Sequence, residues 1–295
     1  MLVTGAAGFV GAHLKAGLGE DAVSFDRDVR DADQVLEAVR GASPSAVVQL
    51  AAVSSVAESW QLTAETWRVN TMGTVNLVDA LLEAAPGARL LLASTGEVYG
   101  RAEELPTTES AQVAPRSPYA ASKAAAELAC EQAVRSPGLD VVIARAFQHE
   151  GPGRDDRFAI GSWTRQIADL ETRGGGVLRV GDLTAERDIS DVRDVVRAYR
   201  ILLGRDVPPG TYNIASGRTV RLSDVVDLLV GMARCPVTVE LDPTRLRPSE
   251  LPVVWGDASK LTGATGWKPE IPLEQTLADT LDYARHLVSE QVGKT

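Results

Sequence analysis

Apolar and polar positions along the first half of the chain alternate between two patterns. Short, mostly apolar runs predict strands that are buried on both faces, as in a parallel sheet. These predicted strands are 1–4, 22–25, 46–50, 89–93 and 141–144. Between them lie stretches with helical periodicity or a high alanine content, at 10–18, 33–40, 64–84 and 117–134. Strands that alternate with helices in this way predict an α/β fold with a doubly wound parallel sheet.

The pattern changes near Gly151. Glycine and proline interrupt it at 151–153 and 174–176. The later predicted strands, near 177–180, 211–214 and 237–241, are shorter and separated by loops. We therefore expect two domains, 1–150 and a smaller C-terminal lobe 151–295. A predicted helix at 192–203 is expected to return to the first domain as part of a segment 188–205.

Composition excludes several classes of protein. The 295 residues are 44% hydrophobic and 24% charged, which is typical of a globular chain. Lys and Arg total 30 against 40 Asp and Glu, so the formal net charge is −10. An acidic chain without a basic run is a poor partner for nucleic acid or an anionic membrane surface. No apolar stretch approaches the ~20 residues of a membrane helix, so we expect neither partner.

Cysteine and histidine are too few and too scattered to organise the fold. The two cysteines, Cys130 and Cys235, are far apart, and His13, His149 and His286 show no metal-ligand spacing. We therefore expect no disulfide framework and no metal site. The N-terminal residues lack the basic and apolar regions of a secretory signal, and we expect a reducing, cytoplasmic location.

A glycine-rich turn, TGAAGFVG at 4–11, follows the first predicted strand. Gly5 allows the tight turn, Gly8 lets a pyrophosphate approach the backbone, and Gly11 lets the next helix lie close to the strand. Free N–H groups and a partial positive charge at the helix start attract phosphate. The turn predicts a Rossmann-type dinucleotide site. Its expected contacts are Gly5, Ala7, Gly8, Phe9, Val10 and Gly11.

An acidic residue follows the second predicted strand. Asp26 lies about twenty residues after the glycines, where a carboxylate binds the ribose hydroxyls. This favours NAD over NADP, because a carboxylate repels the 2′-phosphate. Arg27 could instead accept that phosphate, so NADP stays open. Asp28 and Val29 are expected to flank the adenine.

Tyr119 and Lys123 are four residues apart in a predicted helix and share one face of it. An ammonium and an oxidised nicotinamide would lower the phenol pKa from its usual value of about 10. Tyr119 could then exchange a proton with a substrate hydroxyl or carbonyl near neutral pH. The spacing alone also fits a solvated helix face, but the glycine turn ahead of it favours catalysis.

Polar residues follow the strand 89–93. The carboxyl ends of parallel strands are where ligands bind in this architecture. Thr95 could hydrogen-bond the reacting oxygen, and Glu97 could act as a second acid or base. Ser94 beside them also fits a capping role at the strand end.

Together these motifs resemble the extended short-chain dehydrogenase/reductase family, in its nucleotide-sugar branch. The family pattern TGxxGxxG is met at 4–11, and its Ser/Thr–Tyr–Lys triad matches Thr95, Tyr119 and Lys123. The resemblance implies an NAD(P) cofactor and a homodimer built on the helices 64–84 and 117–134. It also implies cofactor contacts from Leu50, Ala51, Ala52 and Asn70.

Four later segments narrow the resemblance. FQHEGPG at 147–153, ERDISDVRDVV at 186–196, RLRPSELP at 245–252 and GWKP at 266–269 are similar to GDP-mannose 4,6-dehydratases and GDP-4-keto-6-deoxymannose reductases. The resemblance implies that Arg187 and Arg247 clamp the substrate diphosphate, and that Ser54, Thr95 and Gln148 contact the substrate. Gln148 and Ala146 stand where the family usually has Asn and Pro, so the sugar or base can differ. Gly96 replaces an Asp of thymidine-linked dehydratases and argues against that subgroup.

The expected function is therefore an NAD(P)-dependent oxidoreductase that reduces the 4-keto group of a GDP-linked 4-keto-6-deoxyhexose. Chain length and the pair Asp242-Pro243 favour a reductase. One alternative is a 4,6-dehydratase or 4-epimerase with tightly bound NAD, in which Glu97 would be the base of the dehydratase. A further alternative is a non-catalytic dinucleotide-binding module.

Overall fold

The computed structural model describes residues 1–246 and 251–292. Its contacts group into two compact units. The first comprises Met1–Ala146, Val195–Ile214 and Asp257–Trp267. The second comprises Phe147–Asp194, Ala215–Gly256 and Lys268–Thr295.

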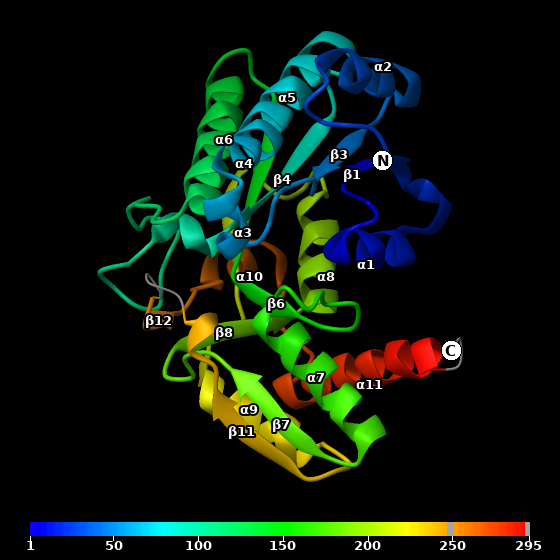
Figure 1. Ribbon diagram of the computed structural model, residues 1–295. Coiled ribbons are helices and arrows are strands. Elements are labelled where there is room, and N and C mark those ends of the chain that lie inside the picture. Colours follow the sequence, from blue (N-terminus) through cyan, green and yellow to red (C-terminus); the bar gives the residue numbers. More distant parts are fainter. Residues whose placement is uncertain (247–250, 293–295) are drawn as a thin grey trace. The chain divides into compact units, whose positions relative to one another are not determined.

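A six-stranded sheet forms the centre of the first unit (Figure 1). Its order is β2-β1-β3-β4-β5-β9, and every pairing is parallel. The winding reverses between β1 and β3, which makes the carboxyl ends of these strands the expected ligand site. The strands are β1 (Leu2–Thr4), β2 (Val23–Phe25), β3 (Ala46–Gln49), β4 (Arg89–Thr95), β5 (Asp140–Ala146) and β9 (Gly210–Ile214).

Helices cover both faces of this sheet, which explains the continuous apolar strands. Leu90 and Leu92 of β4 pack in one core cluster, whereas Leu91 between them packs in the other. Successive side chains of a strand point to opposite faces, so both must be apolar. Figure 1 shows α5 and α6 on one side of the sheet and α1 and α8 on the other. The helices are α1 (Phe9–Leu18), α2 (Ala32–Ala42), α5 (Gly73–Ala84), α6 (Pro118–Arg135), α8 (Val192–Leu202) and α10 (Ser259–Thr265).

The single helix predicted at 64–84 is continuous in the structure, but it contains a π-helical turn that was not predicted. A π-helical turn, Arg68–Met72, separates α4 (Thr63–Trp67) from α5, and a further helix, α3 (Val56–Gln61), precedes it. Apolar periodicity does not reveal a π turn, because such a turn is stabilised by tertiary contacts. Here Asn70 within the turn binds residues of two other segments.

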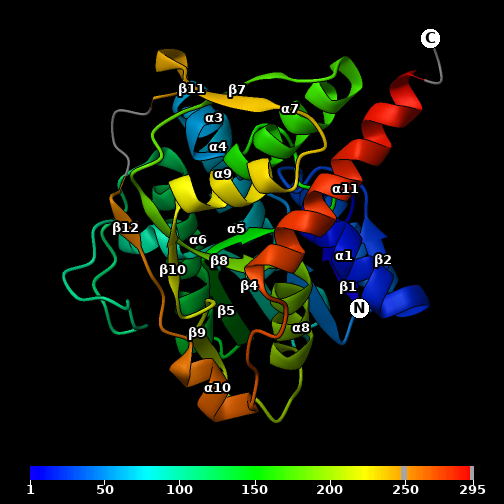
Figure 2. The same cartoon turned by 90° about the horizontal axis from the view of Figure 1, so that it is seen from below.

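The strand expected at 211–214 belongs to the first unit and not to the C-terminal lobe. This strand is β9, and it pairs with β5. The residues of a strand do not reveal its pairing partner, so the sequence did not show this. The returning segment is 195–214 instead of 188–205. The reason is that β8 (Glu186–Asp191) pairs with three strands of the second unit, which are β6 (Gln148–Glu150), β10 (Thr219–Arg221) and β12 (Val253–Val254). Helix α10, which lies beside β9 in Figure 2, also returns, and the sequence did not predict this.

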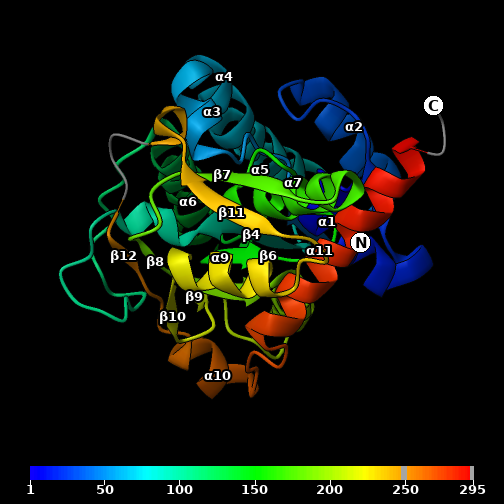
Figure 3. The ribbon, with the colours of Figure 1, turned by 60° about the horizontal axis from the view of Figure 1, so that its bottom comes forward.

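Two small sheets form in the described part of the second unit. One has the order β10-β8-β12 with β6 (Gln148–Glu150) paired to β8, and β7 and β11 form the other, as Figure 3 shows. A core that includes Trp163, Leu178 and Leu281 joins its sheets and helices. The remaining elements are β7 (Gly176–Val180), β10 (Thr219–Arg221), β11 (Val237–Leu241), β12 (Val253–Val254), α7 (Ala159–Arg173), α9 (Leu222–Gly231) and α11 (Leu273–Val292).

Acidic residues of the segment 186–196 fasten loops of the second unit. The buried carboxylate of Asp188 accepts hydrogen bonds from the backbone N–H groups of Ser216 and Gly217, at 2.7 and 3.0 Å. Asp194 accepts from the N–H groups of residues 270 and 271, at 2.9 and 3.0 Å. Carboxylates that satisfy buried backbone donors serve the fold.

The described residues bear on membranes and metals in two ways. No helix within 1–246 and 251–292 has the length and hydropathy that a bilayer-spanning segment needs. The described part of the chain also contains no group of three or more His, Cys, Asp or Glu side chains arranged to hold a metal ion.

Candidate active site

Glycine is required by geometry at the turn between β1 and α1. Gly5 has a φ of +63°, and a Cβ there would lie 2.7 Å from the backbone nitrogen of Ala51. A Cβ on Gly11 would lie 2.4 Å from the carbonyl oxygen of Gly5. Because these neighbours are backbone atoms, larger residues would force the turn, the helix or the β3 loop apart.

The N-terminus of α1 is suited to an anion. Gly8 is the N-cap residue and supplies no side-chain hydrogen bond to the first turn. Ala7 and Gly8 are exposed, whereas Phe9 and Val10 are half-buried. Backbone N–H groups of an uncapped ten-residue helix attract phosphate oxygens. These residues therefore fit the pyrophosphate of a dinucleotide.

Thr4 joins the glycine turn to the loop after β3. Its hydroxyl oxygen accepts hydrogen bonds from the backbone nitrogens of Leu50 and Ala51, each at 3.1 Å, and it donates to Gln49. Leu50, Ala51 and Ala52 are half-buried. The two loops that the sequence assigned to the cofactor are thus held against each other.

Charged residues follow β2, where the ribose carboxylate was predicted. Asp26 is exposed, and Arg27 pairs with Glu37 of α2. Asp28 pairs with Arg30, whose hydrogen bond lowers the pKa of that carboxyl.

The side chain of Val29 is buried in the core, 5% exposed, where it packs against Gly73. Only the backbone of Val29 is therefore left to make the predicted contact with adenine.

Asn70 was expected to contact the cofactor, and the structure gives it another role. Its amide oxygen accepts from the backbone nitrogen of Val53 at 2.8 Å, and its amide nitrogen donates to the Val53 carbonyl and to the Ser122 hydroxyl, at 3.1 and 2.9 Å. The residue is only 1% exposed. Protein atoms cover and bind this amide, and a contact with the cofactor stays a prediction. Asn70 positions the β3 loop against α6.

Helix α6 carries the predicted proton donor and its partner. Ser117 caps the helix by accepting a hydrogen bond from the backbone nitrogen of Ala120 at 3.1 Å, which fixes Tyr119 in the first turn. Tyr119 is half-buried. One turn further on, the Lys123 ammonium donates to the carbonyl oxygen of Ala93 at 2.8 Å. Burial lowers the pKa of Lys123 to about 8.

Thr95 and Glu97 lie at the carboxyl end of β4. Thr95 is the last residue of the strand, and its hydroxyl oxygen accepts from the backbone nitrogen of Glu97 at 3.2 Å. This bond begins a 3₁₀ turn, Gly96–Tyr99, on which Glu97 is half-buried. The hydroxyl of the neighbouring Ser94, for which the sequence also fitted a capping role, donates to the buried Glu127.

Hydrogen bonds, joined by short steps along the backbone, therefore connect the predicted cofactor and catalytic segments of the first unit. The connection passes from Thr4 to the β3 loop, through Asn70 to Ser122 of α6, and through Lys123 to Ala93 of β4. Ser122 and Glu127 were not among the residues predicted for the site. The only signal for either was its place on the helix face beside Tyr119 and Lys123.

The predicted substrate residues are divided between the units. Ser54 is exposed in the first unit. In the second unit, Gln148 donates to Glu150 at 3.1 Å, and the buried Arg187 donates to the carbonyl of Glu186 at 2.9 Å. Arg247 lies outside the described residues. Their contacts with a substrate stay predictions.

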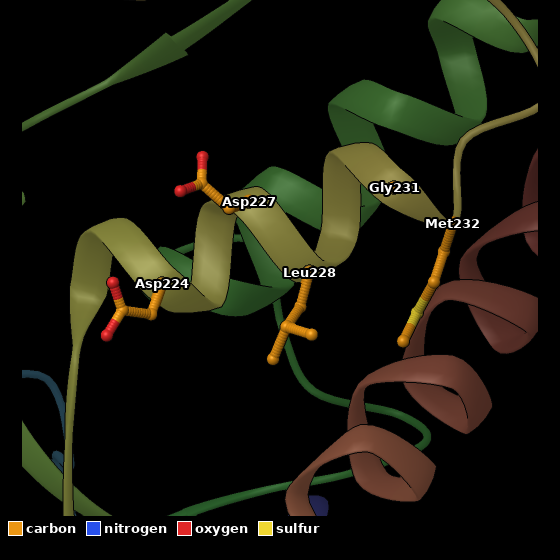
Figure 4. Close-up of a pocket in the computed structure, with 5 residues that line it drawn as sticks. All are labelled: Asp224, Asp227, Leu228, Gly231 and Met232. Atoms are coloured by element: carbon orange, nitrogen blue, oxygen red, sulfur yellow. The ribbon is translucent and has the colours of Figure 1, made fainter.

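A surface pocket of the second unit involves other residues. Figure 4 shows it on α9, where the carboxylates of Asp224 and Asp227 project from the helix. None of the predicted site residues lines it, and its two acidic groups do not suit a phosphate ligand. The lining residues are Asp224, Asp227, Leu228, Gly231 and Met232.

Comparison with known proteins decides the family. The profile of the family described as GDP-mannose 4,6 dehydratase matches residues 19–280. The chain belongs to this family. The resemblance inferred from its motifs is confirmed. Among the relatives of this family member, a GDP-6-deoxy-D-mannose reductase of Pseudomonas aeruginosa is 37% identical over 99% of each chain.

The solved and curated relatives differ in activity although the solved ones share one fold. The Pseudomonas aeruginosa protein RMD, solved with NADPH, superposes with a TM-score of 0.89 at 35% identity, over 97% of this chain and 99% of that one. A UDP-glucose 4-epimerase of Thermotoga maritima, solved with UDP-glucose, gives 0.86 at 26% identity, over 97% and 99%. A GDP-mannose 4,6-dehydratase of Sinorhizobium fredii is 29% identical over 88% of this chain and 80% of its own. The fold prediction is confirmed, but fold alone does not select among these reactions.

Proposed function

We propose that the protein is an NAD(P)-dependent reductase of the 4-keto group of a GDP-linked 4-keto-6-deoxyhexose. The observation that carries this proposal is the pair Tyr119 and Lys123 on α6, whose Lys123 bonds the carbonyl of Ala93 on β4, two residues before Thr95. The full-length similarity to a GDP-6-deoxy-D-mannose reductase supports reduction over the other reactions of the family.

The chemistry requires a hydride and a proton. The glycine turn and Lys123 would hold a reduced nicotinamide dinucleotide, and this group would supply the hydride for C4 of the sugar. Tyr119 donates its phenolic proton to O4, and the Thr95 hydroxyl holds that oxygen by a hydrogen bond. The carbonyl thus becomes a secondary alcohol. The Lys123 ammonium holds the cofactor ribose and favours the ionised form of the phenol, which makes Tyr119 a better acid.

The proposed substrate contacts follow from charge and geometry. A planar guanidinium can pair with two oxygens of a diphosphate, which suits Arg187 and Arg247. Gln148 and Ser54 would bind hydroxyl groups of the sugar through their amide and hydroxyl groups. Gln148 replaces the usual Asn of the family, and we propose that it adjusts which sugar is accepted.

We propose NAD as the preferred cofactor, with NADP as the alternative. Asp26 is exposed at the end of β2, where it would repel a 2′-phosphate. Arg27, the nearest candidate to bind that phosphate, pairs with Glu37. The related RMD was solved with NADPH, so the preference of this chain needs a direct measurement.

The reductase proposal is tested by following NADH absorbance with purified protein. With the GDP-4-keto-6-deoxyhexose as substrate, net consumption of NADH is expected. With GDP-mannose instead, no 4-keto product is expected. Tight cofactor binding without turnover on either sugar would contradict the reductase proposal. It would favour a non-catalytic dinucleotide-binding module.

A dehydratase is the second candidate, and Glu97 favours it. This carboxyl follows Thr95 at the end of β4, where a base for sugar C5 would be needed. Formation of a 4-keto product from GDP-mannose with no net change in NADH would support it. In that case Glu97→Gln should reduce elimination much more than reduction, because only elimination needs the base.

We further propose a homodimer in a reducing, cytoplasmic environment. Trp60 of α3 is 57% exposed and Leu128 of α6 is 61% exposed, and Met72 lies half-exposed beside the same helices. These elements contact one another, and exposed large apolar side chains on neighbouring helices support an interface there. Cys130 and Cys235 are free thiols, as a reducing compartment allows.

A further inference from the structure

A buried carboxylate lies one helical turn beyond Lys123. Glu127 of α6 is 3% exposed. It accepts hydrogen bonds from Nε and Nη2 of Arg145 on β5, at 3.0 and 2.6 Å, and from the hydroxyl of Ser94 on β4. Both charged side chains are almost fully buried. One acidic group therefore joins a helix to two strands beneath the predicted catalytic residues.

The contacts of Glu127 continue those of Lys123. Lys123 binds the carbonyl of Ala93, and Glu127 binds the side chain of the next residue, Ser94. Two successive residues of β4 are thus fastened to two successive turns of α6. Thr95 follows immediately, so its position relative to α6 depends on this attachment.

Arg145, the partner of Glu127, also contacts the last residue of the 3₁₀ turn that follows Thr95. The Arg145 guanidinium lies 4.8 Å from the centroid of the Tyr99 ring. Tyr99 ends the 3₁₀ turn and donates to the amide oxygen of Asn213 on β9 at 2.7 Å. The turn is thus held at its start through Ser94 and at its end through Tyr99.

Stability alone is a poor account of this arrangement. Burying an ion pair costs desolvation energy that its attraction offsets only when the geometry is good, and apolar residues often replace such pairs without loss. A carboxylate that binds a guanidinium through two bonds fixes direction as well as distance. An active site needs its groups in fixed orientations, because the donor and acceptor atoms of the reaction must meet at a short distance.

We propose that Glu127 is a positioning residue, which acts through Ser94 and Lys123 to hold Thr95 and the ammonium in register with Tyr119. The inference rests on the proposed reductase activity. The Glu127 carboxylate also favours the charged form of Lys123, against the desolvation that burial imposes. Glu127 itself is assigned no contact with substrate or cofactor.

Ser94→Ala tests this with little disturbance, because it removes the link to β4 and leaves the Glu127–Arg145 pair intact. We expect kcat to fall about tenfold to hundredfold, since a shift on the order of 1 Å has such an effect on rate. The KM for the sugar and the NADH affinity measured by fluorescence titration should change less than about twofold, because uniform binding is retained. The matched control is Glu131→Gln, one turn further along α6 in an exposed pair with Arg135.

Glu127→Gln is the second variant, with the rate expressed per folded molecule by circular dichroism. It should lower kcat at least as far as Ser94→Ala, and the losses of the two changes combined should not add, because both break one connection. A wild-type kcat in Ser94→Ala overturns the inference. A wild-type enzyme without any reductase turnover overturns the proposed function instead.

Discussion

Lys123 donates a hydrogen bond of 2.8 Å to the carbonyl oxygen of Ala93, two residues before the end of β4. The side chain is 4% exposed, so its ammonium lies within the protein interior. Burial makes the charged form costly, and the carboxylate of Glu127 compensates in part. The residue is therefore held in position by a contact whose strength depends on its charge.

This relationship predicts how activity depends on pH. Burial lowers the pKa of Lys123 to about 8, so the ammonium predominates below that pH and is lost as the pH rises through it. We expect kcat, measured at saturating NADH, to decline above pH 8. The groups that shift this pKa are Glu127 and Cys130 on the same helix, and Arg145 faces Glu127 from β5.

The Glu127→Gln variant tests whether the decline of kcat above pH 8 comes from Lys123 or from Tyr119. Loss of the carboxylate removes support for the ammonium, so the decline should begin at lower pH in this variant. Glu131→Gln should leave the profile in place. A kcat that stays constant well above pH 8 in the wild type would show that the charge on Lys123 is not needed.

Gly11→Ala should damage both stability and cofactor binding. Its Cβ would lie 2.4 Å from the Gly5 carbonyl oxygen and 2.7 Å from Ala6 Cα, so backbone must shift. We expect the free energy of unfolding to fall by about 1–3 kcal/mol, as in other overpacked sites. Gly41→Ala is the matched control, because no atom lies within 4 Å of its Cβ position. In a helix this control should gain about 0.5–1 kcal/mol. Equal effects of the two changes in urea denaturation would argue against close packing at Gly11.

Asp26→Asn should increase the use of NADPH relative to NADH. The change removes a negative charge that would lie near the 2′-phosphate. We expect the ratio of kcat/KM values to shift by about tenfold, since close charges at a protein surface interact by a few kcal/mol at most. Asp33→Asn, an exposed acid at the start of α2, is the control. An unchanged ratio in the Asp26 variant would place the ribose elsewhere.

The strands and the glycine turn could be predicted because their signals are local. Burial on both faces requires continuous apolar runs, and the turn at Gly5 requires a positive φ. The place of β9 could not be predicted, because its partner β5 is distant in sequence. Asn70 looked like a ligand contact, since nothing in its own segment shows that Val53 and Ser122 bind its amide. Glu127 had no signal apart from its spacing on α6.

Leu128→Glu should convert a dimer into a monomer in light scattering. This side chain is 61% exposed on α6, and a charge in a closed apolar interface is unfavourable. Leu241→Glu on β11 of the second unit, where Leu241 is 58% exposed, should leave the mass unchanged. A monomeric mass for the wild-type protein would refute the proposed homodimer.

The proposed reduction of the 4-keto group depends most directly on the phenol of Tyr119. Tyr119→Phe removes the proposed proton donor and keeps the ring. We expect NADH affinity within about twofold of wild type, and kcat with the GDP-4-keto-6-deoxyhexose reduced by about 10²–10⁴-fold, the range typical of a lost general acid. A Tyr119→Phe enzyme that binds NADH and turns over at the wild-type rate would contradict the proposed mechanism.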